Sequence, residues 1–112
     1  MDDSTFETLA DKTLSALMEA VDETLGDYLD VDLQNGILTI EVDGGGEYVI
    51  NKHGPNRQIW MSSPVSGASH FDYDDEMGWV STRGGGRFAA MLADELSAAT
   101  GEEVDADDLG VD

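Results

Sequence analysis

Between residues 28 and 82 this chain contains six short segments that read as β-strands, and in several of them apolar and polar residues alternate. In the second segment Leu38, Ile40 and Val42 alternate with polar residues, which is the side-chain period of a β-strand. The Asn35-Gly36 pair before it is a strong signal for a two-residue hairpin turn. Strands joined by such tight turns run antiparallel, so the sequence predicts one antiparallel sheet of about six strands. The predicted strands cover residues 30–33, 38–42, 47–51, 57–62, 70–73 and 79–82.

Two segments with helical periodicity flank these strands. Apolar residues recur at steps of three and four over residues 4–25, where Ser4 or Asp3 can cap the helix and Glu7 completes a capping box with Ser4. A second amphipathic helix is predicted over residues 88–101. Because both apolar helix faces need cover, both helices should lie on one face of the sheet. The expected fold is a two-layer α/β sandwich of the α+β class in the order αββββββα, with the other sheet face open to water.

The length of 112 residues is sufficient for a single domain with one two-layer core. The acidic tail over residues 102–112 has only isolated apolar residues, so we expect it to pack loosely onto this domain. No apolar run approaches the roughly 18 residues of a membrane span. The N-terminus is acidic from its second residue and lacks the basic start of a signal peptide. We therefore expect a bacterial cytoplasmic protein, or a mitochondrial matrix protein from which a leader has been removed.

The charge balance is strongly acidic, with five Lys+Arg against 25 Asp+Glu and a formal net charge of −20. Such a surface repels nucleic acids and anionic membranes, and it attracts cations and basic protein patches. The chain has no cysteine, so it cannot form thiolate metal sites or ligate an iron–sulfur cluster through cysteine.

Catalytic motifs are weak throughout the chain. The glycine runs at residues 44–46 and 84–86 do not continue into a phosphate-binding loop and fit turns. His53 and His70 are the only histidines, and no spacing links either of them to a serine or threonine nucleophile. Among 25 acidic residues, carboxylate pairs carry no information about glycoside chemistry. We expect no enzyme activity of the chain's own.

Acidic residues gather at the end of the first predicted helix and the start of the first strand. Negative charge at a helix C-terminus is disfavoured by the helix dipole, so the clustering is costly. One interpretation is a solvated face in a protein that is acidic throughout, as a salty habitat would also favour. The other is a shallow all-oxygen surface for hard cations such as Fe³⁺, Mg²⁺, Ca²⁺ or Mn²⁺, and for Fe²⁺ at modest affinity. The residues concerned are Glu19, Asp22, Glu23, Asp27, Asp30 and Asp32.

The fourth predicted strand contains a second candidate site. Alternation places Ile59 and Met61 on one face and Trp60 on the other, beside Gln58 and Ser62. The reverse orientation would bury Gln58 and Ser62, so we expect Trp60 to point outward. An exposed indole on a rigid sheet is typical of a binding surface.

The segment YVINKHGPNRQIWMSSPVSGASHFDY at residues 48–73, followed by GWVSTR at 78–83, resembles the signature region of the frataxin family. The likeness extends over roughly residues 4–100. It implies the frataxin fold and a small acidic protein of iron–sulfur cluster assembly that binds iron weakly, as Fe²⁺ or Fe³⁺. It also implies docking on the complex of a cysteine desulfurase with an iron–sulfur scaffold protein. We expect a monomer, with an iron-dependent oligomer as the alternative.

By position, the resemblance implies two functional surfaces. The implied metal-binding residues are Glu7, Asp11, Glu19, Asp22, Glu23, Asp27, Asp30 and Asp32. The implied partner-binding residues are Asn51, Gln58, Trp60 and His70. The leading hypothesis is an iron chaperone or iron-binding regulator of cluster assembly. The alternatives are an iron-storage or ferroxidase protein, and a pure protein-interaction regulator with incidental metal binding. An acidic nucleic-acid mimic would explain the charge but not the Trp60 strand.

Overall fold

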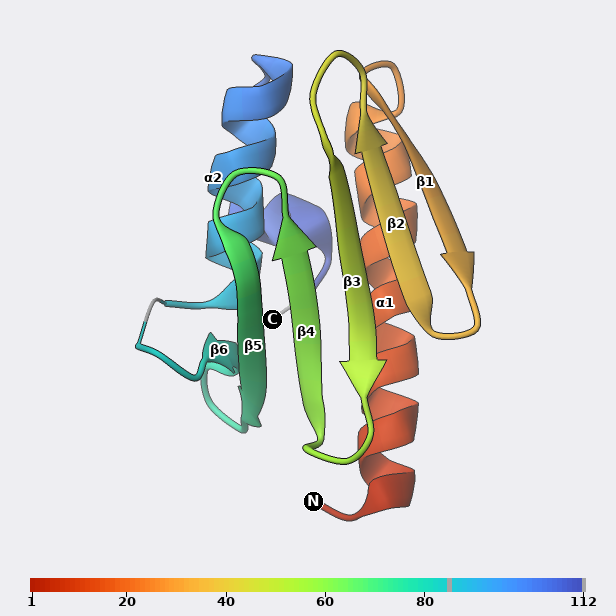
Figure 1. Ribbon diagram of the computed structural model, residues 1–112, viewed down its shortest axis with the longest axis vertical. Coiled ribbons are helices and arrows are strands. Elements are labelled where there is room, and N and C mark those ends of the chain that lie inside the picture. Colours follow the sequence, from red (N-terminus) through yellow and green to blue (C-terminus); the bar gives the residue numbers. More distant parts are fainter. Residues whose placement is uncertain (85, 112) are drawn as a thin grey trace.

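The computed structural model describes residues 1–84 and 86–111 and shows two helices on one face of a six-stranded antiparallel sheet (Figure 1). Strands that follow one another in the chain are neighbours in the sheet, from β1 to β6. The predicted α+β sandwich and its element order are confirmed. The elements are α1 (Asp3–Leu25), β1 (Leu29–Gln34), β2 (Ile37–Val42), β3 (Glu47–His53), β4 (Gln58–Ser63), β5 (Gly67–Asp74), β6 (Gly78–Ser81), α2 (Phe88–Thr100) and the 3-10 helix η1 (Ala106–Leu109).

Helix α1 begins earlier than the sequence pattern indicated. Asp2 is its N-cap, and one Asp2 carboxylate oxygen accepts a hydrogen bond from the Thr5 backbone N–H at 2.7 Å. The expected caps, Ser4 and Asp3, instead lie inside the first turn. Negative charge in a first turn is favoured by the helix dipole, which makes Asp3 suitable there.

The turn between β1 and β2 sets the register of the first hairpin. Asn35 and Gly36 have φ values of 53° and 76°, as a two-residue turn of this kind requires. Gln34 therefore pairs with Ile37, and the pairing continues to Leu29 opposite Val42. A Cβ atom at position 36 would also lie 2.8 Å from Lys52 Cε, so a larger residue there would combine an unfavourable positive φ with a shift of the Lys52 side chain.

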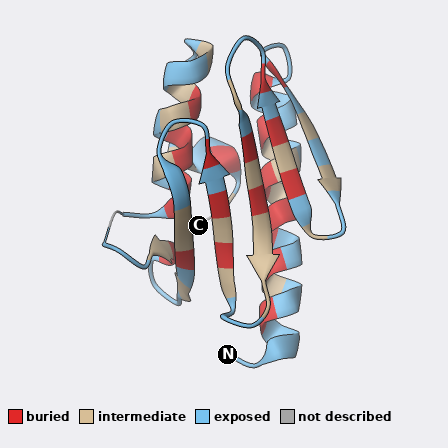
Figure 2. Ribbon diagram, viewed as in Figure 1, coloured by how far each residue is buried: buried red, intermediate tan, exposed pale blue. Residues whose placement is uncertain are grey.

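The core lies between the sheet and the two helices. In Figure 1, α1 lies behind β1 to β3 and α2 lies behind β4 and β5. Buried residues alternate with less buried ones along β2, β3 and β4 and recur along each helix, as the colours of Figure 2 show. Trp79 is buried, and its Nε1–H donates to Thr13 Oγ1 at 3.2 Å, so the polar atom of the indole is satisfied inside the core.

The C-terminal tail is more tightly packed than its composition predicted. Val104 and Leu109 are buried, and η1 contacts both helices. Ser97 Oγ accepts a hydrogen bond from the Val104 backbone N–H at 3.0 Å. The two apolar residues are spaced so that both reach the core, which corrects the expectation of a loose tail. None of the helices in the described part of the chain is long and apolar enough to cross a membrane.

Candidate functional site

The open face of the sheet carries an ordered set of side chains, because the strands are paired without interruption. In β4, Ile59 and Met61 are buried towards the helices while Trp60 lies on the other face. The predicted orientation of Trp60 is therefore confirmed. One row of side chains crosses this face, each residue directly opposite the next: Gln34, Ile37, Asn51, Trp60 and His70.

Trp60 is only partly buried, yet both faces of its indole are covered. The His53 ring stacks on it with a centroid distance of 3.6 Å, and the His70 ring stacks with a centroid distance of 4.1 Å. The indole Nε1–H donates to Gln58 Oε1 at 2.8 Å, and Gln58 Nε2 donates to Asp72 Oδ1 at 2.9 Å. Trp60 is thus less exposed than the strand pattern suggested, since two imidazoles shield it.

The four residues implied for partner binding meet at one place. Asn51 lies opposite Trp60 on β3, and its Nδ2 donates to the Lys52 carbonyl oxygen at 3.2 Å. His53, which the sequence argument weighed only as a catalytic base, belongs to the same group. It lies two residues after Asn51 on β3 and so shares its face. Alternation would have placed His53 on this face only if the predicted strand over residues 47–51 had been extended by two residues.

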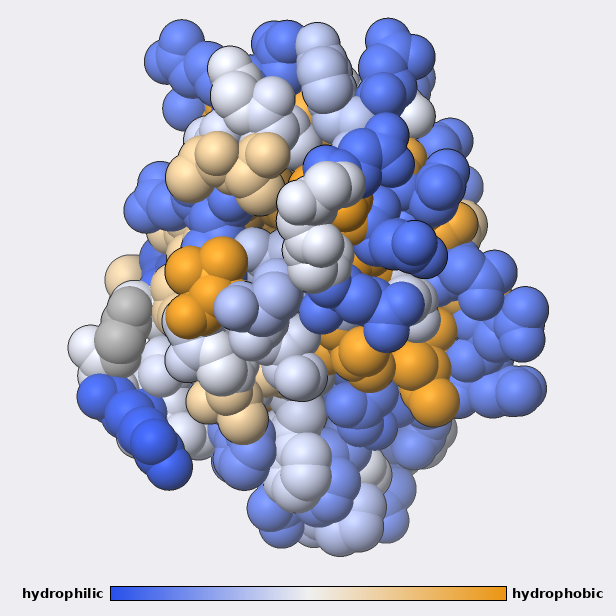
Figure 3. Space-filling view, turned by 45° about the horizontal axis from the view of Figure 1, so that its top comes forward, coloured by the Kyte–Doolittle hydropathy of each residue, from blue (hydrophilic) through white to orange (hydrophobic). Residues whose placement is uncertain are grey.

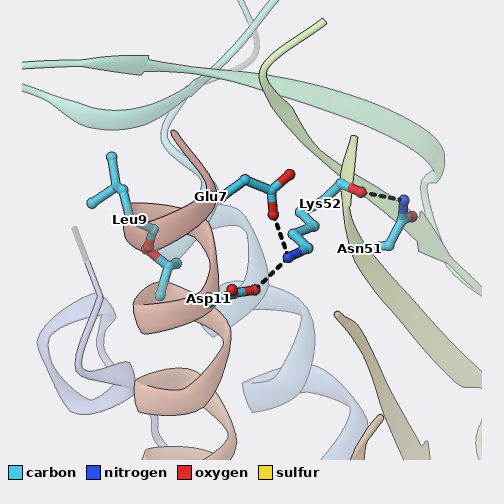
Figure 4. Close-up of polar contacts among 6 residues, drawn as sticks. Glu7, Leu9, Asp11, Asn51 and Lys52 are labelled. Carbon is cyan, nitrogen blue, oxygen red and sulfur yellow. Dashed lines mark hydrogen bonds and ion pairs between the residues drawn. The ribbon is translucent and has the colours of Figure 1, made fainter. Parts of the chain in front are cut away.

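Two of the implied metal-binding residues are already paired with a lysine. The Lys52 ammonium lies 2.5 Å from a Glu7 carboxylate oxygen and 2.8 Å from one of Asp11 (Figure 4). The hydrogen bonds that Lys52 donates to the carboxylates of Asp11 and Glu7 raise the pKa of Lys52 above its ordinary value. Arg57 forms a similar pair with Asp3 at 2.8 Å. Any cation that binds Glu7 and Asp11 must therefore compete with Lys52.

The other six acidic residues are exposed and form no ion pair within residues 1–84 and 86–111. Glu19, Asp22 and Glu23 lie on α1, whereas Asp30 and Asp32 point to the open sheet face because Leu29 points to the core. The two groups thus belong to different layers of the sandwich. Among the described residues, no three His, Cys, Asp or Glu side chains come close enough to hold one metal ion together. This arrangement suits dispersed, hydrated cations better than a closed centre.

The register adds two carboxylates that the sequence argument left out. Asp30 lies opposite Glu41, and Glu41 lies opposite Glu47, so three exposed acids form a row on the open face. Like charges directly opposite one another are destabilising. The two-residue turn at Asn35-Gly36 already implied the first of these pairings. In Figure 3 hydrophilic residues dominate this view and leave only small hydrophobic patches.

The fold and its surfaces define a small, acidic α/β sandwich that offers an open sheet face for binding. The family model for the frataxin-like domain matches residues 1–102. The chain belongs to the frataxin family. The mitochondrial frataxin of Arabidopsis thaliana is 41% identical over 104 residues, which cover 88% of this chain and 56% of that protein. The iron-sulfur cluster assembly protein CyaY of Thioalkalivibrio sulfidiphilus is 39% identical over 107 residues, which cover 93% of this chain and 98% of that protein.

Solved structures agree with this assignment. Frataxin from Psychromonas ingrahamii superposes with a TM-score of 0.83 at 29% identity, covering 95% of this chain and 98% of that one. The trimeric frataxin of Saccharomyces cerevisiae, crystallised in complex with ferrous iron, gives a TM-score of 0.75 at 38% identity, covering 83% and 86% of the two chains. The chain thus spans nearly the whole length of these two bacterial relatives but only about half the length of the Arabidopsis protein.

Proposed function

We propose that this chain is an iron-binding regulator of iron–sulfur cluster assembly that docks on a cysteine desulfurase–scaffold complex and carries out no chemistry of its own. The main support for the proposal is that this member of the frataxin family presents Trp60 on the open face of its sheet, between Asn51 and His70. A bacterial relative that matches over nearly its whole length is named as an iron–sulfur cluster assembly protein. The proposed working state is a monomer in the bacterial cytoplasm or the mitochondrial matrix, with an iron-dependent oligomer as the alternative.

The docking surface combines a central aromatic side chain with neighbours that can form hydrogen bonds. Asn51, Gln58 and His70 surround Trp60, and Ile37 adds exposed apolar area within the row, directly opposite Asn51. Aromatic side chains of this kind supply much of the affinity of protein interfaces. The net charge of −20 steers the chain towards a basic patch on its partner.

The docking proposal is tested by Trp60→Ala, with Ser62→Ala as the matched control. Ser62 lies on the same strand and the same face but outside the row of Trp60. We expect Trp60→Ala to weaken binding to a desulfurase–scaffold complex by about tenfold or more, because a central aromatic is removed, and Ser62→Ala to bind as the unmodified chain does. Isothermal titration calorimetry gives both affinities. Equal binding by the two variants would refute docking through this face.

Iron is proposed as cargo or effector, bound weakly by the six exposed carboxylates from Glu19 to Asp32. Their dispersed arrangement supports exchangeable binding rather than a ferroxidase or storage centre, which needs a fixed set of ligands. Anaerobic titration of Fe²⁺ into nitrogen-15-labelled protein should broaden the amide signals of residues 19–32. It should spare those of the tail and affect Glu7 and Asp11 less, because Lys52 already occupies their carboxylates.

Lys52→Met provides the matched variant for the iron titration. Without the competing ammonium, the signals of Glu7 and Asp11 should broaden at lower Fe²⁺ concentration, while those of residues 19–32 respond as before. Uniform broadening over every acidic stretch, the tail included, would show that the charge acts generically. In that case the chain is an interaction module with incidental metal binding.

A further inference from the structure

Trp60 is the middle ring of a three-ring stack on the open face of the sheet. His70 is its direct cross-strand partner on β5, and its ring lies nearly parallel to the indole, at 8°. His53 reaches the opposite indole face from β3, at 10°. Because His53 pairs with Gln58 in the register, it approaches Trp60 diagonally across the two strands.

The stack leaves little freedom to the indole. Its two faces are covered by imidazoles and its N–H is held by Gln58, which is itself hydrogen-bonded to Asp72. A partner therefore cannot stack on Trp60 or take its N–H without breaking these contacts. What remains for a partner is the outer edge of the indole, in a fixed orientation.

His53 gains this position at a cost. Its Nδ1 atom is buried and has no hydrogen-bond partner among the described residues. A buried polar atom without a hydrogen bond is unfavourable, so Nδ1 of His53 does not stabilise the folded state. The flat shape of the ring is favourable, because it covers one face of the indole. The role of His53 therefore rests on the shape of its ring and not on a hydrogen bond from Nδ1.

We propose that His53 is a positioning residue of the docking surface: together with His70 it clamps Trp60 so that the partner meets a preorganised indole edge. The inference rests on the proposed docking function and adds a residue and a mechanism to it. Holding a contact side chain in its bound orientation removes part of the ordering cost of binding. The partner surface that fits is an apolar slot for an aromatic edge, flanked by groups that hydrogen-bond to Asn51 and Gln58.

The test compares His53→Ala with His53→Phe. Alanine removes the ring, whereas phenylalanine keeps a flat ring and discards the unpaired nitrogen. We expect His53→Ala to weaken binding to the desulfurase–scaffold complex by about five- to tenfold, and His53→Phe to stay within about twofold of the unmodified chain. Calorimetry measures both, and urea unfolding confirms that each variant is folded.

A second experiment measures how well the two histidines shield Trp60 in the free protein. The chain has two tryptophans, and Trp79 is only 1% exposed, so acrylamide quenching of the fluorescence reports mainly on Trp60. His53→Ala should increase quenching, because one indole face is uncovered, and His53→Phe should not. A residue that merely stabilised the fold would not produce this pattern at equal stability.

The outcomes separate the two proposals. If Trp60→Ala weakens binding but His53→Ala does not, the docking function stands and the clamp is refuted. If His53→Phe binds as weakly as His53→Ala, the imidazole contacts the partner directly, and positioning is again refuted. If Trp60→Ala itself binds normally, the proposed docking function fails and the clamp has no role in it.

Discussion

A single glutamate on α2 organises one end of the sandwich. Glu95 Oε1 accepts hydrogen bonds from Tyr48 Oη at 2.9 Å and from Ser63 Oγ at 2.5 Å, and Glu95 Oε2 accepts one from Ser66 Oγ at 2.8 Å. The carboxylate thus joins α2 to β3 and to the turn after β4. Burial, and secondarily the hydrogen bond to Glu95, raises the pKa of Tyr48 to about 12.

The raised pKa of Tyr48 predicts a loss of stability in alkali. A phenol whose pKa is higher in the folded state than in the unfolded state favours folding below the unfolded value, which is 10.0 here. That contribution should disappear as the pH rises from 10.0 to about 12, because the unfolded chain loses its proton first. Urea unfolding at pH 8 and pH 11 would measure it, with Tyr48→Phe as the control. An equal alkaline loss in Tyr48→Phe would contradict the prediction.

The helices and strands were predicted mainly from the periodicity of apolar residues along the sequence. The helical and strand periods of the sequence predicted both helices, all six strands and the outward face of Trp60, because each period reports which side of an element meets the core. The Asn35-Gly36 turn predicted the first hairpin. These are local properties, so a sequence can show them.

Contacts between elements were harder to predict. The Lys52 pairs with Glu7 and Asp11 join β3 to α1, and nothing in the local pattern of either segment indicates them. The stack of His53 on Trp60 depends on the β3–β4 register and on side-chain rotamers. The separation of the acidic residues between two layers likewise follows from the assembled sandwich. These features depend on how the elements pack against one another, and the periodicity of a single segment contains no information about that packing.

The contribution of the C-terminal tail to the core can be tested at Leu109. Leu109 is fully buried between the helices, with 0% of its surface exposed. Leu109→Ala should lower the free energy of unfolding by about 2–4 kcal/mol, because it removes buried apolar atoms and leaves a cavity. Asp107→Ala, at an exposed position of the same short helix, is the matched control and should have little effect. Similar unfolding midpoints in urea for the two variants would mean that the tail does not contribute to the core.

At the scale of the whole molecule, the charge has two opposing effects. The net charge of −20 destabilises the compact state through repulsion, although Lys52 and Arg57, two of the five basic residues, tie the β3–β4 hairpin to acids of α1. The same charge would accelerate the approach to the basic partner that the proposed function requires. Salt screens both the repulsion and the steering, so a higher salt concentration should raise the stability of the fold and lower the rate of association.

Salt should therefore stabilise the free chain while slowing its docking. The screening length falls from about 10 Å at 0.1 M salt to about 3 Å at 1 M, so repulsion between exposed carboxylates weakens and the unfolding midpoint in urea should rise. Over the same range, stopped-flow mixing with the desulfurase–scaffold complex should give an association rate that falls by about tenfold or more. The dissociation rate should change little, since it depends on the Trp60 contacts and not on long-range steering. A dissociation rate that rises as steeply as the association rate falls would place ion pairs inside the interface, and the exposed carboxylates from Glu19 to Asp32, rather than the stack of Trp60 with His53 and His70, would then hold the complex together.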